Sequence, residues 1–321
     1  MKNLVISFYK ETYKCFIRLT MNSNHHFSKI KTNLEVLRKI GAKIPNGEYL
    51  CPVCFRPFKE SEIPMLTEED VPQASLGGSR ITLTCRKCNS NCGALIDVHL
   101  QEALKAREQQ EFLPNTDRKV SVMVDGQRLN AKLEVGENKD LKLVVDTKRN
   151  NPKVWDDFRE NKLVPNAIVD LQDAPLKHQQ ERVEAAIIKN AYLLLFAQTG
   201  FTLLSHSYYD CFRNVILNPD NNQLPVRLWT MQNVSCPDGV FMSENEGLKG
   251  FYVSFTLSLK KNYKFLVFIP LPKCNYDEIK NSLTNIVPGK KIKLIPFDIR
   301  KDYLTDEIVI KELRKWCGLD D

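Results

Sequence analysis

Several features that mark common protein classes are missing from the sequence. No stretch approaches the roughly 18 uncharged apolar residues that a membrane-spanning helix requires, and the most apolar segment, 190–204, is interrupted by Gly200. Residues 116–321 contain neither a G-x-x-x-x-G-K loop nor a G-x-G-x-x-G turn, the patterns of common nucleotide-binding sites. Histidine is scarce, with five in the chain, and no Ser/His/Asp arrangement can be placed. We therefore expect no membrane span, and residues 116–321 are interpreted by elimination as a specificity or assembly module.

An export signal is also missing at the N-terminus, where Lys10, Glu11 and Lys14 interrupt the apolar residues. Met21 is a second candidate start, because residues 1–20 show no periodic pattern. A chain without such a signal is expected in the reducing cytoplasm. In that compartment, ten cysteines indicate metal ligands and free thiols rather than disulfides.

The net charge of +7 is concentrated in one part of the chain. Residues 1–50 contain nine Lys/Arg and three Asp/Glu, a difference of +6, whereas residues 51–116 contain seven and nine, a difference of −2. A basic arm of this kind is suited to contact with the phosphates of DNA. The alternative is an ordinary solvated surface helix, because charged runs usually are that.

Hydrophobic periodicity predicts a mixed α+β chain. Residues 28–40 repeat apolar residues at helical spacing, with Ser28 as N-cap and Gly41 as the stop. Residues 177–199 predict the strongest helix, and its apolar C-terminal half predicts burial. The remaining predicted elements are a helix in 93–112, a hairpin and a further strand in 119–146, a helix in 152–162, four strands in 225–272, and two closing helices in 276–287 and 306–318.

These elements suggest three segments. The first is a basic N-terminal arm with one helix, residues 1–50. The second is a small cysteine-rich module, residues 51–115. The third is a larger mixed α+β region, residues 116–321.

Four of the cysteines form two C-x-x-C pairs, in "CPVCFRPF" (51–58) and "LTCRKCNSNCG" (83–93). A two-residue gap lets both thiolates of a turn face one ion, and tetrahedral Zn²⁺ accepts two such pairs. The second pair opens a predicted helix, whose N-terminus favours the thiolate form. We therefore predict one structural zinc ion with four ligands, Cys51, Cys54, Cys85 and Cys88. Cys92 is expected to pack in the core.

The 30 residues between the pairs have room for two strands and a loop. We call a turn that carries a C-x-x-C pair a knuckle. A knuckle, then a hairpin, then a second knuckle at the start of a helix is the layout of a treble clef. The stretch "LTEEDVPQASLGGSRITLTCRKCNSNCG" (66–93) is similar to a family pattern of an acidic residue and His, then Pro, Gly-Gly, a strand and C-x-x-C-Asn. Residues 51–115 thus resemble the HNH (ββα-metal) nuclease family with a four-cysteine zinc site.

The resemblance implies metal-dependent hydrolysis of DNA, in which Mg²⁺ or Mn²⁺ stabilises the leaving oxygen and a histidine activates water. Glu69 would match the acidic metal ligand and Asn89 the helix ligand. Asp70 stands where the general-base histidine belongs, and Arg80 stands near the position of the family's middle Asn. A carboxylate with an ordinary pKa of ~3.9 is a far weaker base than an imidazole near ~6.5. The site therefore resembles a nuclease site that has lost its base.

Two features have simpler interpretations. The "TEED" segment could cap a short helix, with Thr67 as N-cap and Asp70 at the third position. His99 is the only histidine of the module, but it lies 11 residues past Cys88, or about 16 Å along a helix. This distance from Cys88 is long for a histidine that would replace the missing general base.

Three functions follow from these observations. The first is an HNH-type DNA endonuclease with a degenerate site, as in restriction or phage defence. The second is a catalytically inactive HNH fold that binds nucleic acid, a partner protein or another copy of itself. The third is a zinc-stabilised scaffold. The basic arm with Arg80, Arg86 and Lys87 favours the first two, because these side chains could meet phosphates.

Overall fold

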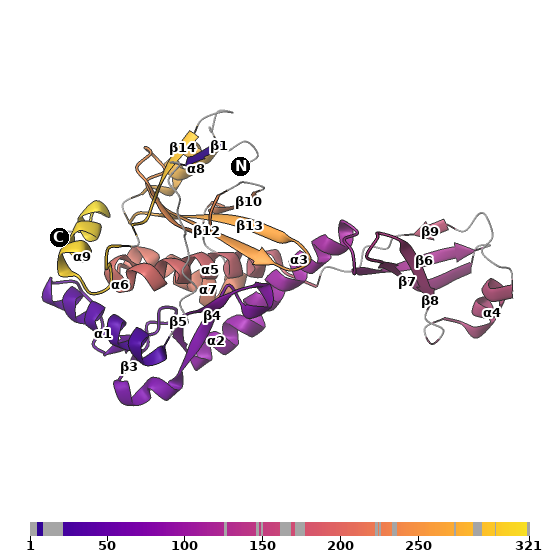
Figure 1. Cartoon of the computed structure of the whole chain (residues 1–321), viewed down its shortest axis with the longest axis horizontal. Helices are drawn as coiled ribbons and strands as arrows, with labels where there is room; N and C mark the ends of the chain where they lie inside the picture. The colour runs from indigo at the N-terminus through magenta and orange to yellow at the C-terminus, as the bar shows by residue number, and fades with distance from the viewer. Residues whose placement is uncertain are drawn as a thin grey trace. The chain divides into compact units, whose positions relative to one another are not determined.

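The computed structural model describes the greater part of the chain. The described residues are 5–8, 22–124, 127–145, 148, 150–160, 168–170, 177–221, 224, 226–232, 236–272, 274–284, 291–298 and 300–319. Residues 1–4 and 9–21 of the predicted basic arm lie outside them. The chain is mixed α and β, as the sequence predicted (Figure 1). No described helix combines the length and the apolar character needed to cross a membrane.

The chain divides into two compact units. Unit 1 comprises residues 1–100 and 180–321, and unit 2 comprises residues 101–179. These boundaries differ from the three sequence segments described above, because the cysteine-rich module shares a unit with the C-terminal region. Unit 2 is thus an insertion between two stretches that pack together.

Unit 1 contains a six-stranded sheet in the order β1-β14-β11-β12-β13-β10. The strands are β1 (Val5–Phe8), β10 (Trp229–Gln232), β11 (Gly239–Ser243), β12 (Gly250–Ser258), β13 (Asn262–Pro270) and β14 (Lys291–Pro296). β1 pairs with β14 in parallel, and the other pairs are antiparallel. The four strands predicted in 225–272 are confirmed. The sequence analysis missed β1 and β14, two short strands that are far apart in the sequence.

Helix α5 (Gln180–Thr199) forms the centre of unit 1 (Figure 1). One side of it packs against β12 and β13, and other parts contact the hairpin of β4 (Leu66–Val71) and β5 (Ser79–Cys85). Fourteen of its twenty residues are buried, which confirms the predicted burial of this helix. Its apolar surface on several sides is explained by these contacts with two separate layers.

The other described helices of unit 1 are α1 (Ser23–Lys39), α2 (Arg86–Cys92), α6 (Phe201–Leu204), α7 (Asp210–Leu217), α8 (Tyr276–Thr284) and α9 (Glu307–Trp316). Helix α3 (Val98–Gln110) begins in unit 1 and has most of its residues in unit 2. Short helical turns are η1 (Glu60–Met65), η2 (Ala74–Leu76), η3 (Gly93–Asp97), η5 (Ser207–Tyr209) and η6 (Pro219–Asn221). Both predicted closing helices are present as α8 and α9.

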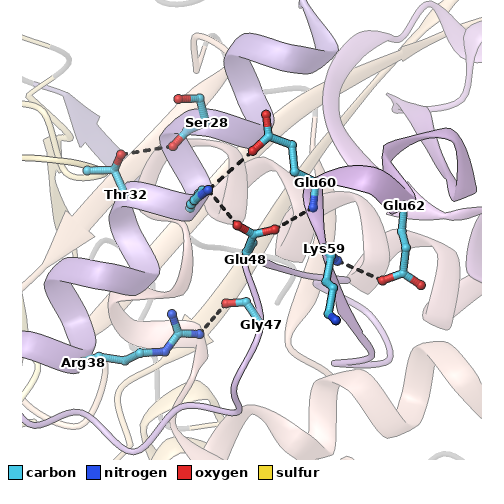
Figure 2. Close-up of polar contacts among 9 residues, drawn as sticks. Ser28, Thr32, Arg38, Gly47, Glu48, Lys59, Glu60 and Glu62 are labelled. Atoms are coloured by element: carbon cyan, nitrogen blue, oxygen red, sulfur yellow. Dashed lines mark hydrogen bonds and ion pairs between the residues drawn. The ribbon is translucent and has the colours of Figure 1, made fainter.

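Helix α1 is attached to the cysteine-rich module by polar contacts (Figure 2). Lys31 Nζ donates to Glu48 Oε1 over 2.7 Å, and Glu48 Oε2 accepts from the Glu60 backbone over 2.6 Å. Arg38 Nη2 donates to the Gly47 carbonyl over 2.6 Å. α1 also buries Phe27, Ile30, Leu34 and Leu37. Helix α1 is therefore an integral part of unit 1. Two of its basic side chains, Lys31 and Arg38, already form hydrogen bonds within the protein.

Unit 2 contains a four-stranded antiparallel sheet, a helix of its own and the greater part of α3. Its strands are β6 (Asp117–Val124), β7 (Gln127–Val135), β8 (Leu141–Val145) and β9 (Ile168–Asp170), in the order β8-β7-β6-β9, and its helix is α4 (Pro152–Glu160). The core consists of Val120, Val122, Leu129, Ala131 and Leu133. The predicted hairpin, third strand and helix of this region are confirmed.

Candidate metal centre and neighbouring buried cluster

The two cysteine pairs lie on a knuckle and on a hairpin-helix unit. Strands β2 (Tyr49–Leu50) and β3 (Pro57–Phe58) flank the first pair. The β4–β5 hairpin follows, and Cys85 ends β5 and serves as the N-cap of α2, which contains Cys88. The predicted helix start at the second pair is confirmed. Both pairs are thus presented by tight backbone turns.

The four thiols converge on one point. The sulfur atoms of Cys51, Cys54, Cys85 and Cys88 all lie within 4.8 Å of one another. Cys54 Sγ and Cys85 Sγ are 3.7 Å apart, close to the roughly 3.8 Å edge of a tetrahedron with Zn–S bonds of about 2.3 Å. Among the described residues, this is the one group of three or more His, Cys, Asp or Glu side chains that could hold a metal ion. The four cysteines form a site that could bind a metal such as zinc.

The thiols of the cluster differ in their pKa values. Burial raises the pKa of the Cys51 thiol well above its ordinary value. A hydrogen bond from Cys51 is the main reason that the pKa of Cys85 falls to about 6. Burial therefore favours the protonated form of Cys51, and a metal ion that binds all four sulfurs must displace this proton.

The first knuckle is held by the core of unit 1. Phe55 follows Cys54 in the left-handed region, at φ 58°, which costs a residue other than glycine roughly 1–2 kcal/mol. Its ring lies 3.8 Å from the Arg213 guanidinium carbon and packs edge-on against Phe201. Tyr192 of α5 donates a 2.9 Å hydrogen bond to the Pro52 carbonyl. These contacts hold the strained turn in place.

Glu69 points from β4 into the interior of unit 1. Its side chain is 3% exposed. Lys189 Nζ of α5 lies 2.9 Å from its Oε1, and Thr84 Oγ1 donates to its Oε2 over 2.9 Å. Both carboxylate oxygens therefore have buried partners supplied by the protein itself.

Asp97 completes this buried cluster. Its Oδ2 lies 2.6 Å from Lys189 Nζ, and burial raises the pKa of its carboxyl group. It ends η3, a π-helical turn, a form that often marks functional sites. The sequence analysis missed both Lys189 and Asp97. A lysine within a helix predicted to be buried was the available signal.

The other predicted catalytic residues lie elsewhere on the hairpin. Asp70 follows Glu69 on β4 and is half-buried, and the pairing of β4 with β5 shifts register between these two residues. Asn89 of α2 donates to Thr67 Oγ1 over 3.0 Å and to the Glu68 carbonyl over 3.3 Å. The structure thus brings Asn89 next to the outer edge of β4 and places Glu69 inside. The alternative in which Thr67 caps a helix is wrong, because residues 66–71 form a strand.

The predicted nucleic-acid contacts are all at the surface. Arg80, Arg86 and Lys87 are exposed. Arg80 forms a 2.8 Å ion pair with Glu68, and Arg86 donates to the Pro64 carbonyl over 3.3 Å. His99 lies within 3.4 Å of Arg182 Nη1.

Models of protein families, curated proteins and solved structures were all compared with the chain, and none matches it. The assignment of function therefore rests on the residues and geometry described above.

Proposed function

We propose that the protein is a zinc-stabilised nucleic-acid-binding protein whose module of knuckle, hairpin and helix is a treble-clef, HNH-like (ββα-metal) domain without hydrolytic activity. The order of β2–β3, the β4–β5 hairpin and α2 supports this layout, with cysteine pairs at the first turn and at the helix start. The proposed zinc ion is structural.

The observation that carries the proposal is the state of Glu69. A catalytic metal needs carboxylate oxygens that it can reach, as hard cations bind such ligands directly. Both oxygens of Glu69 are instead bonded to Lys189 and Thr84 inside the protein. Asp70 replaces the histidine that the resemblance requires. The proposed site thus lacks the acidic metal ligand that the resemblance assigns to Glu69, as well as the base.

Surface charge supports binding to nucleic acid. Arg86 and Lys87 are exposed on the first turn of α2, where the hairpin and the cysteine cluster meet. Contacts with phosphates come mainly from such side chains and do not depend on base sequence. A binding role that needs no catalytic metal is compatible with these residues.

The first test is plasmid nicking by the full chain with Mg²⁺ or Mn²⁺. We expect no metal-dependent cleavage by wild type or by Asp70→His, because Glu69 stays bonded to Lys189 in both. Asp277→His, on the first turn of α8, is the matched control for an added histidine. Cleavage by wild type would contradict the loss of activity. Cleavage by Asp70→His alone would show that the metal ligands are intact.

The second test measures binding to a fluorescent DNA duplex and to a single strand. The charge reversals Arg86→Glu and Lys87→Glu should each weaken binding several-fold, and should make the dependence of log Kd on log salt shallower by about one or two. Lys119→Glu, an exposed lysine of unit 2, is the control. If all three variants bind as wild type does, or if wild type binds neither probe at low salt, the proposed binding is wrong.

A further inference from the structure

The cluster of Lys189, Glu69 and Asp97 brings together three reactive groups from α5, β4 and η3. Lys189 is 0% exposed and Asp97 is 6% exposed. Lysine is almost never buried to this extent without a partner. Lys189 Nζ contacts one oxygen of each carboxylate, at 2.6 Å and 2.9 Å. One nitrogen nucleophile thus lies against two carboxyl groups in a dry environment.

The charges of the cluster do not balance when all three groups are ionised. One ammonium then faces two carboxylates, and a net charge in the interior is costly. Burial alone lowers the pKa of Lys189, but the carboxylates of Asp97 and Glu69 more than reverse this, while burial raises the pKa of Asp97. Burial also raises the pKa of nearby Cys92 to about 12, so this thiol adds no charge at neutral pH. A proton on Asp97, whose pKa burial raises, makes the cluster neutral.

We propose that Lys189 and Asp97 are joined by an intramolecular isopeptide bond, with Glu69 as the residue that transfers the protons. The neutral cluster includes a form in which the amine of Lys189 faces the carboxylic acid of Asp97. Nζ attacks Cγ, and the new C–N bond forms as the carbonyl π electrons move to oxygen. In this form Glu69 holds the proton that Lys189 has given up, so it donates that proton to the oxygen that becomes negative and then accepts one from the nitrogen. It next donates a proton to the departing hydroxyl group and recovers one from the remaining hydroxyl as the carbonyl forms again. The C–O bond breaks and one water molecule leaves, so no oxidant or other reactant is required.

The geometry favours this reaction. Asp97 Cγ is one carbon–oxygen bond beyond Oδ2 and hence at most about 3.8 Å from Nζ. Groups held in such positions react with effective concentrations of about 10⁵ to 10⁸ M. That advantage offsets the ordinary preference of an amine and an acid in water for the unjoined state. Burial also excludes the water that would reverse the reaction.

The bond would link the two places where the chain leaves and re-enters unit 1. Unit 2, residues 101–179, lies wholly between Asp97 and Lys189 in the sequence. A covalent link there closes a long loop in the unfolded chain and so reduces its entropy. The two segments on either side of the insertion would stay joined even when unit 2 unfolds.

The test is the intact mass of the full denatured chain, followed by sequencing of its tryptic peptides. We expect a mass one water lower than the sequence requires and a branched peptide that joins Asp97 to Lys189. Trypsin should fail to cleave after Lys189. Glu69→Gln keeps a hydrogen-bonding group but cannot accept a proton in the same way, so most of its chains should show the full sequence mass.

A full-mass wild type would overturn the proposal, and the cluster would then be a non-covalent ion pair. Loss of water without the branched peptide would overturn it as well, since Asp125-Gly126 can lose water through its own backbone. Lys105→Arg, a substitution at an exposed lysine of α3, is the control and should retain the branched peptide. The decisive measurement uses wild type alone and does not depend on whether the variants fold.

Discussion

His26 shows how the position of a single side chain changes its chemistry. It is 7% exposed on α1 and forms a 3.2 Å hydrogen bond with Thr82 Oγ1. Burial is the largest reason that its pKa falls to about 4, and the charges of Lys29 and His25 add to the effect. In the unfolded chain its pKa returns to about 6.5. Below that value the unfolded state takes up the proton and the folded state does not.

His26 should therefore make the protein less stable in mild acid. Above pH 6.5, His26 is neutral in both the folded and the unfolded chain, and the protein keeps its full stability. We expect the free energy of unfolding to fall by roughly 3 kcal/mol as the pH falls from about 6.5 to 4. His26→Gln retains a hydrogen bond to Thr82 but does not titrate. Urea unfolding of both proteins at several pH values measures the difference between them, and this comparison cancels acid effects on the thiols. Parallel curves for wild type and His26→Gln would contradict the low pKa.

Glu69 and Asp70 also differ through position alone. Glu69 is buried and bonded to Lys189, whereas Asp70 is half-buried and follows a shift in the pairing of β4 with β5. In the sequence they are two adjacent acidic residues, and no local pattern distinguishes one from the other. Which of the two is buried depends on the layer that the strand covers, and that layer is formed by α5, more than a hundred residues later.

Among the elements, long periodic helices and strands were predicted well and their ends less well. Helix α1 begins at Ser23 after the N-cap Asn22, whose side chain accepts from two backbone N–H groups. The prediction of Ser28 as N-cap is wrong, because the buried face extends one turn earlier, to His26 and Phe27. Periodicity identifies the centre of a helix, whereas the first turn depends on tertiary contacts.

The junction between α5 and α6 allows a direct test of a glycine. Gly200 has φ 55°, and an added Cβ would lie 2.6 Å from Asn33 Oδ1, the acceptor of the Phe201 N–H. We expect Gly200→Ala to lower the free energy of unfolding by about 2 kcal/mol or more. Gly93→Ala is the control, since Gly93 is helical and nothing lies within 4 Å of its Cβ position. Thermal unfolding of both variants is the measurement, and equal melting temperatures would contradict the argument.

For the molecule as a whole, the cysteine cluster is expected to stabilise more than its own segment. The knuckle is bonded to α5 through Tyr192 and to α7 through Arg213, and both helices belong to the core of unit 1. Structural zinc contributes directly to folding. Loss of the metal should therefore loosen unit 1 broadly, while unit 2 retains its own core.

Zinc content and hydrogen exchange test this expectation. Purified wild type and Cys92→Ser should contain about one zinc ion per chain, and Cys88→Ser should contain much less, because Cys92 lies outside the cluster. Chelation should remove the protection of amides in α5 and β12 as well as in 51–92, while β6 and β7 stay protected. Protection lost only in 51–92 would show that the module unfolds alone. Absence of zinc from wild type would contradict the metal assignment.

Local patterns in the sequence were sufficient to predict the four-cysteine cluster, most of the helices and strands, and the buried character of residues 180–199. Spacing determines which thiols can share one ion, and periodicity determines which faces are apolar, so neither depends on distant residues. The partner of Glu69, the pairing of β1 with β14 and the joining of residues 1–100 with 180–321 were not predictable in this way. Each of these is a contact between residues distant in the sequence, and no local pattern specifies it. Burial of the α5 surface brings the β4–β5 hairpin and strands β12 and β13 together around one helix, so the partner of Glu69 exists only in the folded chain.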